Sequence, residues 1–201
     1  MFGYGQQQHL SASLCHSLVL LHNVQLLCIK AGFINSTYLI FAETIYIMTY
    51  VLYIHSILRW LILLFGLLAV LKAIGGITSK KAYTGSDNKT GLFFMIWCDI
   101  QLLLGLVLYF GGAWFDMMKS SAGEVMKNSA NRFFAVEHAL MMIIAWILVH
   151  MGRSMVKRAD SDAQKHKRSL IYFGIALLII LAMIPWPFRT AGIGRQLFPQ
   201  F

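Results

Sequence analysis

The sequence predicts an all-α fold, an integral membrane four-helix bundle with a possible extra helix at the N-terminus. Of the 201 residues, 58% are hydrophobic and 12% are charged, and the mean hydropathy is +0.66. An average soluble domain carries about 25% charged residues. The chain also contains several apolar runs of about 20 residues, the length that crosses a bilayer as a helix. These observations indicate a protein of the lipid bilayer.

The N-terminal residues 1–47 differ from the rest of the chain. They mix short apolar runs with Gln, His, Ser and Asn, and they lack the basic start and cleavage site of a signal peptide. Met48 lies inside an apolar run at residues 38–70. Two interpretations stay open. Either translation begins at Met48, or residues 1–47 add an interfacial or spanning helix to a four-helix transmembrane domain at 48–201.

Four core helices are expected, at residues 49–73, 92–110, 132–153 and 170–184. Glycine pairs follow the first and second helices, and polar turn residues continue the first connection. Pro185 and Pro187 end the fourth, because proline cannot extend the helical hydrogen-bond ladder. The connection at 113–131 is amphipathic in places and is expected along the membrane surface.

The charge distribution predicts the orientation of the chain. The loops at 72–90 and 151–169 together hold ten Lys and Arg residues, whereas the opposite side of the bundle holds five. Because basic loops normally stay in the cytoplasm, these two loops are expected on the cytoplasmic side.

The formal net charge of +9 fits contact with anionic lipid and gives no reason to expect nucleic acid as a partner.

Six polar side chains interrupt the predicted helices. An ionisable side chain at the bilayer centre costs about 2.5–3.5 kcal/mol or more, so such residues normally face the bundle interior. At about 1.5 Å of rise per residue, all six are expected in the outer half or the middle of the bundle. They could form one polar cluster, composed of His55, Arg59, Asp99, Gln101, Glu137 and His138.

His55 and His138 are expected at the same depth on two helices that both run inward. Two neutral imidazoles at one level are what bis-imidazole ligation of a haem iron requires, and helical bundles build such sites. Arg132 and Arg189 near the outer rim are candidates to pair the haem propionates. The alternative interpretation is that both histidines are hydrogen-bonded interior residues.

The remaining polar residues have a more ordinary interpretation. Arg59 and Asp99 are expected to form a compensating buried ion pair. Glu137 is expected to pair with Arg59 or with Arg132. Proton relay through Asp99 or Glu137 is the more specific alternative. His150 is expected at the membrane interface, and His166 is expected on a solvated basic face.

Five sequence segments resemble a family of small bacterial four-helix membrane proteins catalogued as cytochrome-b-like. They are LYIHSILRW, IQLLLGLVLYF, NRFFAVEHALMM, KHK and IPWPFR, and together they extend over residues 53–189, about two thirds of the chain. His55 and His138 match histidines of the family, whereas Asp99 stands where the family often has histidine. The resemblance implies haem b, electron transfer to or from a partner subunit, and a multi-pass location in the bacterial inner membrane.

Two classes of function are thus expected. The preferred one is a cytochrome-b-like membrane subunit holding at most one haem b. The competing class is a non-redox accessory or structural protein, or a small proton-coupled carrier. The sequence shows no nucleotide, flavin or nucleophile motif, and its three cysteines form no CxxC pair, so it does not indicate a stand-alone enzyme.

Overall fold

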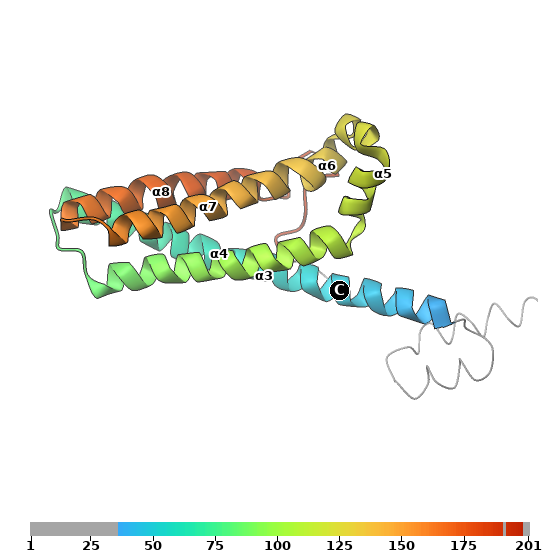
Figure 1. Cartoon of the computed structure of the whole chain (residues 1–201), viewed down its shortest axis with the longest axis horizontal. Helices are drawn as coiled ribbons and strands as arrows, with labels where there is room; N and C mark the ends of the chain where they lie inside the picture. Colours follow the sequence, from blue (N-terminus) through green and yellow to red (C-terminus); the bar gives the residue numbers. More distant parts are fainter. Residues whose placement is uncertain (1–35, 191, 199–201) are drawn as a thin grey trace, which may run out of the picture. The chain divides into compact units, whose positions relative to one another are not determined.

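A computed structural model describes residues 36–190 and 192–198 of the chain. This described part is helical and contains no strand, which confirms the predicted fold class (Figure 1). The elements are α3 (Ser36–Thr78), α4 (Gly85–Gly111), α5 (Ala113–Lys127), α6 (Ser129–Arg132), the π-helix η1 (Phe133–His138), α7 (Ala139–Lys157) and α8 (Asp162–Met183).

Four helical stretches are long and apolar enough to cross a membrane. They are Glu43–Thr78, Gly85–Gly111, Ser129–Lys157 and Asp162–Met183. Large apolar side chains on their outward faces are exposed, such as Leu103 at 64% and Leu178 at 67%. In a bilayer these faces contact lipid chains. The chain is therefore a multi-pass membrane protein.

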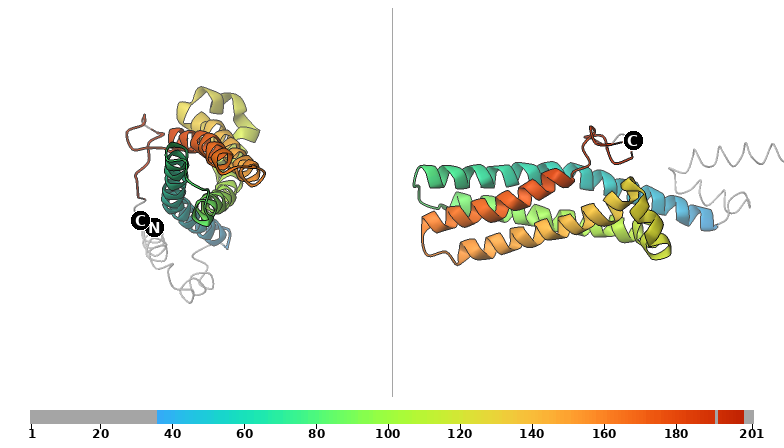
Figure 2. Two further views of the ribbon diagram at one scale, coloured as in Figure 1. Left: turned by 90° about the vertical axis from the view of Figure 1, so that its left-hand side faces the viewer. Right: turned by 90° about the horizontal axis from the view of Figure 1, so that it is seen from above.

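The chain divides into two compact units, 1–49 and 50–201. Within the second unit, α4, α7, α8 and the part of α3 after Tyr50 lie around a common axis, as the end-on view in Figure 2 shows. The short helix α5 runs across the end of this bundle (Figure 1).

Helix α3 extends back through Met48 to Ser36. The interpretations offered for residues 1–35 lie outside the described residues.

Helices α4 and α8 begin earlier than their apolar runs predict, because polar residues cap them. Thr84 and Asp87 form a capping box, in which Asp87 Oδ2 accepts from Thr84 N at 2.8 Å. Ser161 Oγ likewise accepts from Gln164 N at 3.3 Å at the start of α8. The first turns of both helices are thus polar and extend beyond their apolar segments.

The bundle core is built on close contacts between aromatic rings and glycines. Phe94 and Phe173 are fully buried, and their rings meet edge to face at 5.7 Å. A Cβ atom at Gly66 would lie 2.9 Å from the Phe94 ring, and one at Gly152 would lie 2.9 Å from the Phe173 ring. Glycine at both positions lets the helix backbones approach these rings.

Candidate functional site

His138 ends the π-helical segment η1, immediately before α7. Single π-turns inside α-helices occur frequently at functional sites. His138 Nδ1 lies 3.0 Å from the carbonyl oxygen of Met183, the last residue of α8. The last carbonyls of a helix have no partner within it, and a carbonyl can only accept. Nδ1 therefore carries the proton, and the lone pair of Nε2 is left free.

His55 lies on α3, opposite α4. Its Nδ1 atom is buried and has no hydrogen-bond partner among the described residues. The imidazole packs against Gly105, where a Cβ atom would lie 3.4 Å from His55 Cε1. Gln101 Nε2 donates to the His55 carbonyl oxygen at 2.8 Å, which fixes the depth of α4 against α3. The imidazoles of His55 and His138 lie close enough to interact electrostatically.

Two arginines were expected near this histidine pair, and their surroundings differ. The Arg189 guanidinium stacks at 4.7 Å on the ring of Phe133, which lies 5.9 Å from the His138 ring. Arg189 Nη1 is buried without a hydrogen-bond partner in the described part of the chain. Arg132 instead pairs with Glu137 at 2.8 Å and donates to the Met126 carbonyl. Of these two arginines, only Arg189 is therefore left with a buried donor that has no partner among the described residues.

Arg59 is 8% exposed, as expected of an interior residue, but its partners are not the predicted ones. Its Nη2 atom donates to the backbone carbonyls of Gln196 and Leu197. Phe198 stacks on Trp60 with ring centroids 5.6 Å apart, so the segment 192–198 is held against α3. The predicted ion pair between Arg59 and Asp99 is wrong, because backbone carbonyls from a distant segment reach the guanidinium instead.

Asp99 pairs across the bundle with α7. Its Oδ1 atom accepts from His150 Nε2 at 2.7 Å and from Trp146 Nε1 at 2.6 Å. The rings of Trp146 and His150 lie 4.4 Å apart. About a third of the Asp99 and His150 side chains is exposed. The structure therefore places a half-buried carboxylate and imidazole together between two membrane-spanning helices.

The hydrogen bonds of the predicted polar cluster thus fall into five separate groups. Gln101 binds the His55 backbone, His138 binds the Met183 carbonyl, Arg59 binds the 192–198 segment, Glu137 binds Arg132, and Asp99 binds His150. The single cluster was wrong because equal depth does not determine the direction in which each side chain points.

Two histidines have surroundings that sequence reasoning missed. His150 was expected alone at the interface, but it finds its partner on α4, a carboxylate rather than a second histidine. His166 was expected on a solvated face, yet it is 2% exposed. A signal for His166 was present in Gly75–Gly76, since glycine allows a neighbouring helix to approach closely.

Comparison of this chain with protein-family models, with curated proteins and with solved structures finds no match.

Proposed function

We propose that this protein is a membrane electron-transfer subunit that holds one haem b between His55 and His138. The observation that carries the proposal is the hydrogen bond from His138 Nδ1 to the Met183 carbonyl. Metal-ligating histidines almost always donate their second ring N–H in this way, which orients the ring and raises its basicity. The resemblance of residues 53–189 to cytochrome-b-like proteins points in the same direction.

The residues around the histidine pair fit such a group. His55 has a buried ring nitrogen without a partner, and Arg189 has a buried N–H without a partner. The first suits an axial-ligand histidine whose environment is completed by the cofactor, and the second suits a propionate. Arg132, already paired with Glu137, is the weaker propionate candidate. A haem bound here would supply a one-electron redox centre, with an unidentified partner subunit as donor or acceptor.

The experiment is a reduced-minus-oxidised absorbance spectrum of the protein purified from haem-replete membranes. A b-type band in the wild type is expected to disappear in both His55→Ala and His138→Ala. His150→Ala is the matched control, because it removes an imidazole of α7 that lies outside the pair, and it should keep the band. A haem-replete wild type without a band would reject the proposal, and a band that survives either substitution would reject the ligand pair.

The membrane and orientation form part of the same proposal. We place the protein in the bacterial inner membrane with the loops at 72–90 and 151–169 in the cytoplasm, since these loops concentrate Lys and Arg. Cysteine accessibility at engineered positions in the two loops and in α5 tests this orientation. Labelling of both loops from the outer side would reverse it.

A second candidate function is proton transfer, in a small proton-coupled carrier. It is favoured by the Asp99–His150 pair, because ionisable pairs within membrane-spanning helices often belong to proton pathways. Proton flux into proteoliposomes prepared without haem tests it. Flux that is lost in Asp99→Asn and retained in Gln101→Ala would support this function, whereas an absence of wild-type flux would reject it.

A further inference from the structure

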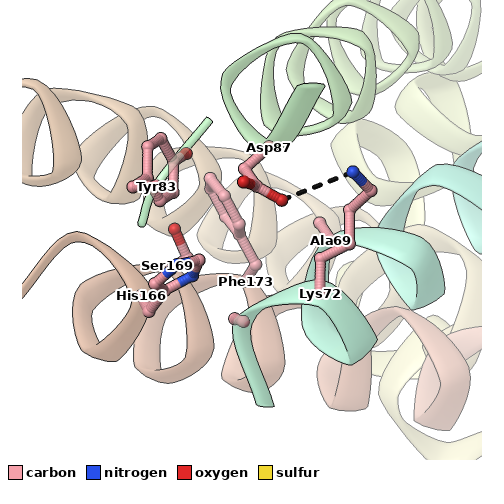
Figure 3. Close-up of a pocket in the computed structure, with 8 residues that line it drawn as sticks. Ala69, Lys72, Tyr83, Asp87, His166, Ser169 and Phe173 are labelled. Carbon is pink, nitrogen blue, oxygen red and sulfur yellow. Dashed lines mark hydrogen bonds and ion pairs between the residues drawn. The ribbon is translucent and has the colours of Figure 1, made fainter. Parts of the chain in front are cut away.

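A small cavity lies at the basic end of the bundle, far along α3 from His55. It has a volume of about 10 Å³, and Figure 3 shows the polar and apolar side chains around it. Lys72 comes from α3, Asp87 from α4, and His166 with Ser169 from α8. Most of these side chains can form hydrogen bonds, although the cavity lies inside a helical bundle.

His166 is the unusual member of this lining. It is 2% exposed, and neither ring nitrogen has a hydrogen-bond partner among the described residues. A Cβ atom at Gly76 would overlap three atoms of the imidazole at nearly equal distances, so the ring lies with its face on the α3 backbone. The rings of His166 and Tyr83 pack in a T-shaped arrangement with their centroids 5.0 Å apart. These packing contacts hold the imidazole in place but give its two nitrogens no hydrogen-bond partner.

The charged groups of the cavity already neutralise each other. Lys72 Nζ donates to Asp87 Oδ1 at 3.3 Å, the dashed contact in Figure 3, and to Ser86 Oγ at 2.8 Å. A ligand of this cavity therefore does not need a charge. It needs both a donor and an acceptor, since a neutral imidazole presents one N–H and one bare nitrogen.

We propose that the cavity is a specific binding site for one water molecule, held by His166 and shared with Ser169 and the Lys72–Asp87 pair. A cavity of about 10–15 Å³ accommodates one water, and buried waters typically join groups that would otherwise lack partners. An apolar ligand would leave the imidazole nitrogens unsatisfied, which costs free energy in a buried site. The bound water connects α3, α4 and α8 at the end where their apolar packing stops.

The direct test is a structure of the purified full-length protein in lipid nanodiscs at a resolution that shows ordered water. The expected result is one water within hydrogen-bond distance of a His166 ring nitrogen. An empty cavity, an ion in place of water, or a His166 ring bonded directly to protein would overturn the proposal.

The sign of a stability change provides a second test. His166→Phe keeps the ring shape and removes both nitrogens. If water is bound, this variant removes the nitrogens that hold it and leaves the buried Ser169 hydroxyl without a partner, so the Tm should fall by several degrees. If no water is bound, the same variant removes two unsatisfied buried nitrogens, and an unchanged or higher Tm would overturn the proposal. His166→Gln keeps a donor and an acceptor and should lose less than His166→Phe.

Discussion

His138 Nδ1 donates a 3.0 Å hydrogen bond to the carbonyl oxygen of Met183, which joins the π-helical segment before α7 to the last turn of α8. This contact gives His138 a structural role that is separable from iron ligation. The two roles predict different behaviour for different substitutions at one position.

In His138→Asn the side-chain N–H₂ can take the place of Nδ1–H, but no nitrogen remains to bind iron. We expect this variant to keep most of its thermal stability and to lack a b-type band. His138→Ala loses both properties, with a stability loss of about 1–3 kcal/mol for the unsatisfied carbonyl. Thermal unfolding in detergent and absorbance spectra measure the two properties. Equal destabilisation by Asn and Ala would contradict the structural role.

Asp99→Ala is expected to destabilise the protein by about 1–3 kcal/mol, because the N–H groups of Trp146 and His150 lose their common acceptor. Asp99→Asn retains a carbonyl acceptor and should cost less. A double-mutant cycle with His150→Ala measures the pair directly. Strictly additive effects of the two single substitutions would show that Asp99 and His150 do not interact.

Gly76→Ala is expected to destabilise the bundle, since the new methyl group would overlap the buried His166 ring. The matched control is the neighbouring Gly75→Ala. Nothing lies within 4 Å of a Cβ atom at Gly75, so alanine there should stabilise the helix by about 0.5–1 kcal/mol. His166→Ala should partly rescue Gly76→Ala. Equal unfolding temperatures for the two alanine variants would contradict the close approach of α3 to α8.

Burial raises the pKa of the Tyr83 phenol, which lies in the loop between α3 and α4. In the unfolded chain the phenol loses its proton near pH 10. The folded protein keeps this proton to higher pH, so it binds more protons in that range, and its stability falls as the pH rises above about 10. Tyr83→Phe should therefore move alkaline unfolding to higher pH. An unchanged alkaline midpoint would show that Tyr83 does not contribute.

The four spans could be predicted from sequence because the bilayer thickness sets the number of apolar residues that a spanning helix needs. A run of that length can be recognised in the sequence without knowledge of the tertiary structure. The starts of α4 and α8 could not be read from hydrophobicity, since Thr84 and Ser161 begin those helices outside the apolar runs. Local capping chemistry would have given both positions.

The candidate site was predictable only in part for a similar reason. Rise per residue is constant in a helix, so counting residues predicts that His55 and His138 lie at one level. The rotation of each helix about its axis depends on packing with its neighbours, and this rotation could not be predicted from the sequence. Asp99 consequently faces His150 and not Arg59, and Arg59 meets carbonyls of the 192–198 segment that no helical periodicity describes.

The acceptors of the Arg59 guanidinium lie 137 and 138 residues further along the chain. A ribosome synthesises α3 well before it reaches those residues, so the nascent helix enters the bilayer with an uncompensated cation. This costs about 2.5–3.5 kcal/mol at mid-depth. The Arg59 guanidinium therefore gains these carbonyl acceptors only after the 192–198 segment has been translated and has packed against α3, so the last residues of the described chain complete its first membrane-spanning helix.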